Sequence, residues 1–190
     1  VNLTTGMRST QIGQIANATG TAVTANALTD GGLTIAIGTG TAVSIGASAA
    51  GTANGQGTDS AYSKVNAINA AGVAGLTATA ANSHSGTFST VSSAAGTSTY
   101  GLTINGVAIY SGVGNIASGA SLTAADVVAQ VNLYSTQTGV SAAVSGTTVT
   151  FSTADGRNTD ITETIANATG TASGTGGQPF SYQITADSPL

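Results

Sequence analysis

The residues best suited to chemistry gather in one short stretch, Asp-Gly-Arg-Asn-Thr-Asp-Ile-Thr-Glu, at positions 155–163. Its side-chain oxygens come from Asp155, Asn158, Asp160 and Glu163, and hard cations such as Ca²⁺ require several oxygen ligands. The spacing fits no EF-hand loop, however, and Arg157 places a positive charge among these oxygens. We therefore expect a turn without a metal, in which Asp155 accepts backbone amides and glycine at 156 relieves strain.

The candidate catalytic and nucleotide-binding residues lack the partner residues that such sites need. His84, the only histidine, has Ser83 and Ser85 beside it but no nearby acid to orient it as a general base, so we interpret it as a polar loop residue. Glu163 is the only glutamate, and the aromatic platforms expected around a glycosidase carboxylate pair are scarce. The glycines at Gly38-Thr-Gly40 come without a P-loop lysine or a full dinucleotide fingerprint. The sequence predicts no enzyme, and no catalytic, cofactor-binding or metal-binding residue.

The amino-acid composition excludes nucleic-acid-binding and membrane-spanning proteins. The 190 residues include three basic and seven acidic side chains, and charged residues make up 5% where about 25% is typical. Three cations cannot form a nucleic-acid surface, and no apolar run approaches the roughly 18 residues of a membrane span. There is no cysteine. With 41% apolar residues the chain should fold, and its few trypsin-type cleavage sites fit an extracellular location.

A hairpin–helix–hairpin plan is predicted in the second half of the chain. Residues 102–109 alternate around Asn105-Gly106, the dipeptide best suited to a tight hairpin. A helix is predicted over 122–131, with Thr123 as its N-cap, Asp126 in its first turn, and a hydrophobic staple between Leu122 and Val127. The strands of a second hairpin are predicted at 139–144 and 148–151, joined by a turn at Ser145-Gly146.

A weaker version of the same plan comes earlier. Residues 33–37 read as a strand and are followed by a glycine-rich stretch that ends near Gly57. A helix is predicted over 60–71, capped by Asp59 and stopped by Gly72. Residues 75–78, Gly-Leu-Thr-Ala, correspond to the strand that begins with Gly-Val-Ser-Ala at 139–142. The predicted fold is therefore α+β and strand-rich, with two tandem hairpin–helix–hairpin repeats and short helices.

One octapeptide, Ile-Ala-Asn-Ala-Thr-Gly-Thr-Ala, occurs twice, at 15–22 and 165–172, on either side of this duplication. We expect the two copies to run side by side where the chain leaves and re-enters a longer parent protein. The predicted segments are an N-terminal edge (1–29) that pairs with a C-terminal edge (163–190), a degraded first repeat (30–97) and a second repeat (98–162).

The repeats resemble the flagellin hook IN motif of bacterial flagellins and related filament proteins. Its elements are matched in order by Ile-Asn-Gly at 104–106, Val-Asn at 131–132, Gly-Val-Ser-Ala at 139–142 and Asp-Gly-Arg-Asn at 155–158. The first repeat retains Ile-Asn at 68–69 and Gly-Leu-Thr-Ala at 75–78, but lacks Ile-Asn-Gly and Asp-Gly-Arg-Asn. The resemblance covers Tyr100 to about Ile161 clearly, and Leu33 to Val91 in a degraded form.

The resemblance implies that the chain is a structural, surface-exposed outer domain of a flagellin. Flagellin is the secreted filament subunit of the bacterial flagellum, so the implied process is motility. The long terminal helices through which flagellins polymerise are not found in this chain, so its contacts with other subunits would lie elsewhere in the parent and the fragment should be monomeric. O-linked glycans are permitted. The three N-glycosylation sequons, which begin at Asn2, Asn17 and Asn167, are interpreted as accidental.

Two alternatives stay open. One is a fragment of a filament-cap or hook-associated protein, which carries related motifs. The other is a carbohydrate-binding adhesin module, in which tyrosines would offer stacking faces. The tyrosines are Tyr62, Tyr100, Tyr110, Tyr134 and Tyr182, and buried packing is expected for most of them.

Overall fold

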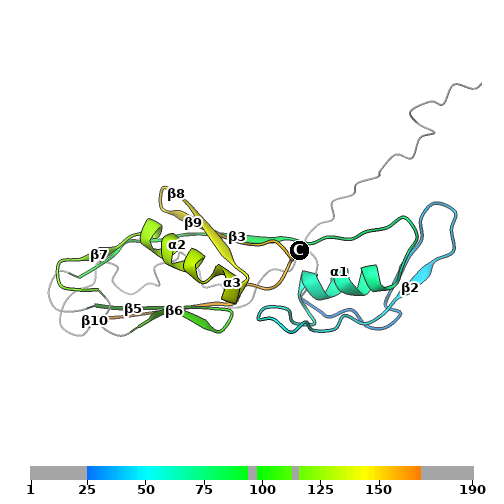
Figure 1. The fold of residues 1–190 in the computed structure, drawn as a ribbon, viewed down its shortest axis with the longest axis horizontal. Coiled ribbons are helices and arrows are strands. Elements are labelled where there is room, and N and C mark those ends of the chain that lie inside the picture. The colour runs from blue at the N-terminus through cyan, green and yellow to red at the C-terminus, as the bar shows by residue number, and fades with distance from the viewer. Residues whose placement is uncertain (1–24, 94–97, 113–115, 168–190) are drawn as a thin grey trace, which may run out of the picture.

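The computed structural model describes residues 25–93, 98–112 and 116–167. Within them the chain forms a strand-rich α+β fold of short helices and small antiparallel sheets (Figure 1). The strands are β1 (Leu33–Ile35), β2 (Val43–Ile45), β3 (Asn82–Thr87), β4 (Val91–Ser92), β5 (Ser98–Ile104), β6 (Val107–Ser111), β7 (Ser121–Leu122), β8 (Ser141–Ser145), β9 (Thr148–Thr153) and β10 (Ile161–Asn167). The helices are α1 (Ala61–Ala70), α2 (Ala124–Leu133) and α3 (Ser135–Thr138).

The molecule is elongated, with two lobes along its length (Figure 1). The first lobe, residues 25–81, contains α1 and the β1–β2 hairpin. The second lobe, residues 82–167, contains the other elements, with three-stranded sheets in the orders β10-β5-β6 and β3-β9-β8. A two-stranded β4–β7 ladder completes it.

The predicted second repeat agrees with the structure. The β5–β6 hairpin turns at Asn105-Gly106, whose φ angles of 49° and 77° suit a tight turn of the type expected for Asn-Gly. Helix α2 begins with a capping box, in which Thr123 accepts from the Asp126 amide and the Asp126 carboxylate accepts from the Thr123 amide. The β8–β9 hairpin follows as predicted.

The first repeat departs from its prediction at three places. Ser60 caps α1, not Asp59, because the Asp59 carboxylate instead accepts a bond from Asn158 in the second lobe. A second strand, β2, lies within the glycine-rich stretch. Residues 75–78 form no strand. Gly72, with φ of 63°, follows the end of α1 as predicted.

The missing hairpin of the first repeat has a topological cause. Strand β3, which follows residues 75–78, pairs along its full length with β9 of the second repeat. Similarly, β4 pairs with β7. Strands on both sides of the predicted boundary at residues 97 and 98 are therefore hydrogen-bonded to one another, and none of the described strands pairs with residues 75–78.

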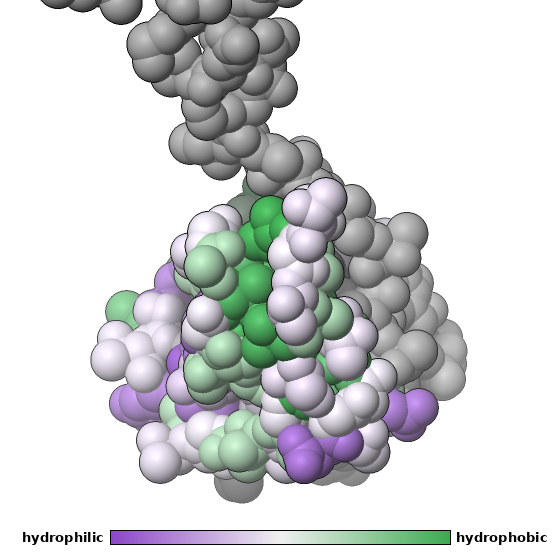
Figure 2. All heavy atoms as spheres, turned by 90° about the vertical axis from the view of Figure 1, so that its right-hand side faces the viewer, coloured by the Kyte–Doolittle hydropathy of each residue, from purple (hydrophilic) through white to green (hydrophobic). Residues whose placement is uncertain are grey.

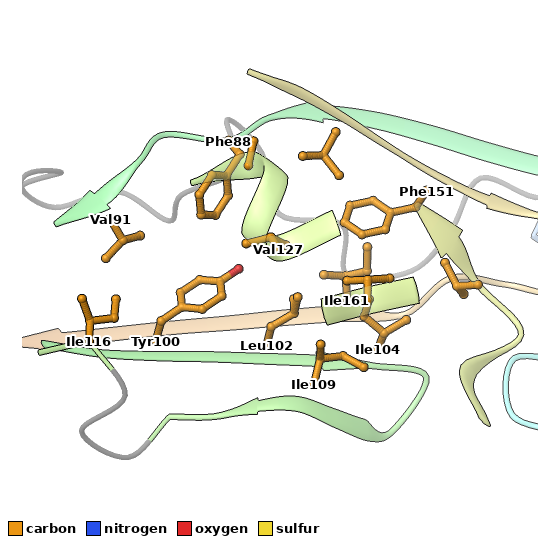
Figure 3. Close-up of a cluster of buried hydrophobic side chains, with 14 residues drawn as sticks. Phe88, Val91, Tyr100, Leu102, Ile104, Ile109, Ile116, Val127, Phe151 and Ile161 are labelled. Carbon is orange, nitrogen blue, oxygen red and sulfur yellow. The ribbon is translucent and has the colours of Figure 1, made fainter. Parts of the chain in front are cut away.

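One buried apolar cluster lies in the second lobe, between the two three-stranded sheets and against α2 (Figure 3). Phe88 and Val91, each 1% exposed, belong to it although they precede the predicted repeat boundary. The cluster consists of Phe88, Val91, Tyr100, Leu102, Ile104, Ile109, Ile116, Ala124, Val127, Val131, Val140, Val149, Phe151 and Ile161.

The first lobe has a much smaller core. Its buried apolar side chains are Ile45, Ala61 and Val73, and Ile37 is 47% exposed. Viewed from the end that carries this lobe, the surface is mostly pale, with an apolar strip down its middle and few strongly hydrophilic residues (Figure 2). The first lobe therefore depends on contacts with the second for much of its order.

Candidate functional site

The Asp155–Asn158 loop, the stretch singled out from the sequence, lies where the two lobes meet. Asp155 accepts from the Arg157 amide at 3.2 Å, and Gly156 has a φ of 74°, so the predicted turn is confirmed. The Arg157 guanidinium also forms an ion pair with Asp155, with an Nη2–Oδ2 distance of 2.7 Å. These contacts within the loop stabilise its conformation independently of its contacts with the first lobe.

This loop binds the first lobe through several polar contacts. Gln56 donates to Asp155 Oδ2 at 3.1 Å, and Asn158 donates to Asp59 Oδ2 at 2.8 Å. Backbone bonds run from the Asn158 amide to the Gly55 carbonyl and from the Tyr62 amide to the Gly156 carbonyl. We call this set of contacts the polar junction.

Arg157 connects both lobes at the polar junction. Its Nη1 lies 3.3 Å from the Asn54 carbonyl in the first lobe and 3.5 Å from the Thr138 carbonyl in the second. A Cβ atom at residue 139 would overlap the guanidinium, and Gly139 also has a φ of 72°. Gly75, the equivalent glycine of the first repeat, keeps a positive φ of 79° but has no atom close to its missing Cβ. This difference follows from the absence of an Asp-Gly-Arg-Asn sequence in the first repeat.

Protonation of Asp155 is tied to these contacts. Burial raises the pKa of Asp155, but hydrogen bonds from Arg157 and Gln56, with the charge of Arg157, outweigh burial. The net pKa of Asp155 lies below its ordinary value. The carboxylate is therefore the form that the polar junction favours.

The asparagines of the two Ile-Asn or Val-Asn elements have the same role in both repeats. Asn69 donates to the Ala78 carbonyl at 2.9 Å and accepts from the Ala78 amide at 2.8 Å. Asn132 forms the same pair with Ala142, at 2.9 and 2.8 Å. Each asparagine side chain thus hydrogen-bonds to the backbone of the following segment as a neighbouring strand would. These bonds link the end of the helix to that segment.

Asn105, of the Ile-Asn-Gly element, is 6% exposed and links three segments. Its side chain donates to the Thr138 carbonyl at 2.9 Å and accepts from the Asp160 amide at 2.8 Å. Its backbone amide donates to the Asp160 carbonyl. The tip of the β5–β6 hairpin is therefore fixed to the segment between the Asp155–Asn158 loop and β10.

The predicted oxygen cluster is divided by the fold. Asp155 and Asn158 face the polar junction, whereas Glu163 accepts from the Tyr100 hydroxyl at 2.5 Å. Burial, then the carboxylate of Glu163, raises the pKa of Tyr100. In the part of the chain that the structure describes, no three His, Cys, Asp or Glu side chains lie close enough to hold a metal ion.

His84 is not in a loop, and that prediction was wrong. It lies in β3 opposite Phe151 of β9, and Ser83 and Ser85 point to the other face of the sheet. Alternation along a strand therefore separates the histidine from both serines. Burial lowers the pKa of His84.

The tyrosines that the structure describes contribute largely to packing. Tyr100 is fully buried and makes edge-to-face contacts with Phe88 and Tyr110, at ring-centroid distances of 6.0 and 5.3 Å. Tyr110 and Tyr134 are half-buried against the same cluster. Tyr182 lies outside the described residues.

Sequence inspection missed Gln56, Asp59 and Asn82 as partners of the Asp155–Asn158 loop. Gln56 and Asp59 are 99 residues from their partners, and Asn82 donates to the Arg157 carbonyl across 75 residues. No local pattern marks such contacts.

Among the described helices, none is long and apolar enough to cross a membrane. Comparison with protein-family models and with curated proteins finds no match to this sequence.

Proposed function

We propose that this chain is a surface-exposed outer domain of a flagellin, with a structural role in a bacterial flagellar filament. One observation carries the proposal: asparagines at matching motif positions, Asn69 and Asn132, make matching two-bond contacts with Ala78 and Ala142. The remaining motif positions, in Ile-Asn-Gly and Asp-Gly-Arg-Asn, supply Asn105, Asp155 and Arg157. Each of these has a defined structural contact.

The composition supports the same role. With 5% charged residues and a net charge of −4, the chain offers few sites for attachment of polyions, and its three cations offer few sites to trypsin-like proteases. The residues at the motif positions make contacts that link separate segments of the fold. An elongated domain with few charged and many hydroxyl side chains suits the coat of a filament, from which every subunit projects one copy.

A graft into a flagellin tests this proposal. The outer domain of a flagellin that forms well-studied filaments would be replaced by residues 1–190, with a short Gly-Ser linker at the same position as the matched control. We expect filaments of normal length that bind antibodies against this chain along their whole surface, in immunogold electron microscopy. Filaments that form with the linker but never with the graft would contradict the proposal.

The isolated chain provides a second measurement. We expect a monomer in gel filtration and no selective retention on a glycan array. Selective, tight binding to one glycan class would instead support the adhesin alternative, and spontaneous fibres would show that an assembly surface is present in these residues.

A further inference from the structure

The sequence contains two Asn-Gly dipeptides, Asn54-Gly55 in the first lobe and Asn105-Gly106 at the tip of the β5–β6 hairpin. Asparagine followed by glycine is especially prone to spontaneous deamidation, because glycine has no side chain to shield its amide nitrogen from the preceding side-chain carbonyl group. In an unfolded chain the two dipeptides should therefore react at similar rates. A large difference between them in the folded protein must come from the structure.

The fold protects Asn105 from this reaction. Its side chain donates to the Thr138 carbonyl at 2.9 Å and accepts from the Asp160 amide at 2.8 Å, and the residue is 6% exposed. Attack by the Gly106 nitrogen would require the side-chain amide to rotate and to lose both bonds. Because β5 contributes to the buried cluster, such a rearrangement requires the hairpin to separate from the core of the second lobe.

Asn54 is much less protected. The residue is exposed, and its side chain forms no hydrogen bond with any residue that the structure describes. The Gly55 amide nitrogen also has no acceptor among the described residues, so it is available for attack on the side chain before it.

The backbone around Asn54 is held by contacts of the polar junction and by one turn. The Asn54 carbonyl accepts from Arg157 at 3.3 Å, the Gly55 carbonyl accepts from the Asn158 amide at 2.7 Å, and the Gln56 amide closes the turn. Only local opening of this junction is needed to free the Asn54-Gly55 peptide group. Local opening costs less free energy than the opening of a core hairpin, and the first lobe has a small core.

A longer backbone at this position would not fit the junction. Gly55 packs so closely that a Cβ atom on it would overlap the Asn158 carbonyl oxygen and lie 2.9 Å from Asn105 Nδ2. Isoaspartate, the main product of deamidation, inserts one extra carbon atom into the backbone immediately before Gly55. We therefore expect this product to displace Gly55 and to break its bond with the Asn158 amide.

We propose that Asn54 is a site of spontaneous deamidation, and that isoaspartate at this position releases the first lobe from the Asp155–Asn158 loop. The Gly55 nitrogen loses its proton to solvent and attacks Asn54 Cγ. The new N–Cγ bond forms, the Cγ–Nδ2 bond breaks, and ammonia leaves. One water molecule then opens the succinimide ring, at Cγ to give aspartate or at the backbone carbonyl to give isoaspartate. This inference does not depend on the function of the chain.

Peptide mapping by mass spectrometry tests the site. The full chain is incubated at mildly alkaline pH, folded or in urea, and deamidation at residues 54 and 105 is followed with time. In the folded chain, Asn54 should react at least about tenfold faster than Asn105, and in urea the two rates should be similar. Asn54→Gln is the control and should remove the fast phase, because glutamine must form a slower six-membered ring. Similar rates at both sites in the folded chain would overturn the proposal.

Hydrogen exchange tests the effect on the junction. The isoaspartate form is separated from the unreacted chain by anion exchange and compared with Asn54→Asp, which adds the same negative charge without the extra backbone atom. Exchange in residues 54–62 should be at least about tenfold faster in the isoaspartate form, while Asn54→Asp should stay close to the unchanged chain. Exchange in β9 should be unchanged in both. Equal exchange in residues 54–62 of the two forms would overturn the proposed release of the first lobe.

Discussion

At the scale of single residues, the molecule uses amide side chains as substitutes for backbone. Asn69 and Asn132 each bind one backbone amide and one backbone carbonyl, of Ala78 and Ala142 respectively, and Asn105 binds the Thr138 carbonyl and the Asp160 amide. Asparagine suits this role because its side chain carries both a donor and an acceptor with the geometry of a peptide group. Aspartate offers the acceptor alone.

This role predicts a graded series at Asn132. Asn132→Ala removes two hydrogen bonds and should lower the free energy of unfolding by about 1–2 kcal/mol, since a net bond contributes roughly 0.5–1.5 kcal/mol. Asn132→Asp retains the acceptor for the Ala142 amide but not the donor, so its loss should be intermediate. Asn66→Ala, at an exposed position of α1, is the control and should be neutral or slightly stabilising because alanine favours helices. Urea unfolding followed by circular dichroism measures all three, and equal effects at positions 66 and 132 would argue against the role.

At the scale of elements, the Asp155–Asn158 loop should make the junction between the lobes sensitive to acid. The folded-state pKa of Asp155 lies below its unfolded value of about 3.9, so its contribution to stability is present above that pH and is lost as the pH falls through the folded pKa. Asp155→Asn should therefore reduce the stability lost between pH 7 and pH 3. Asp126→Asn is the comparison. Hydrogen bonds from Thr123 also hold the pKa of Asp126 below its ordinary value, but Asp126 is far from the polar junction along the chain.

The two variants differ in where the acid effect should be seen. Loss of Asp155 should accelerate hydrogen exchange in residues 54–62, which contact the loop, whereas loss of Asp126 should affect α2. An Asp155→Asn variant whose exchange in residues 54–62 matches that of the unchanged chain at neutral pH would contradict this assignment.

Elements with strong local signals were predictable from the sequence, and elements that depend on distant partners were not. Asn105-Gly106 specifies its hairpin through backbone preference, and Thr123 with Asp126 specifies the start of α2, because each pattern acts within a few residues. Asp59 was predicted to cap α1 on local grounds, but Ser60 forms the cap and the Asp59 carboxylate accepts a hydrogen bond from Asn158, 99 residues away. The contacts of the Asp155–Asn158 loop with Asn82 and with the first lobe likewise join residues 75–103 positions apart, for which the chain gives no local signal.

At the scale of the whole molecule, the two repeats predicted from the sequence are not two independent structural units. The second lobe takes β3 and β4 from the earlier half of the chain, and with them Phe88 and Val91 (Figure 3). The first lobe retains a helix and a two-stranded hairpin with three buried apolar side chains. The last strands of the predicted first repeat therefore belong to sheets of the second lobe.

This sharing predicts how fragments of the chain should behave. Residues 82–167 contain the whole buried cluster and should fold cooperatively, with a single thermal transition in circular dichroism. Residues 98–167 lack β3, Phe88 and Val91, and truncation of one buried Phe to Ala alone costs about 3–5 kcal/mol, a large share of the stability of a small domain. The shorter fragment should therefore show no cooperative transition, and residues 25–81 should also remain unfolded. A fragment 98–167 with the same thermal midpoint as 82–167 would mean that the second repeat is complete by itself, and that β3 adds only an outer strand to a finished core.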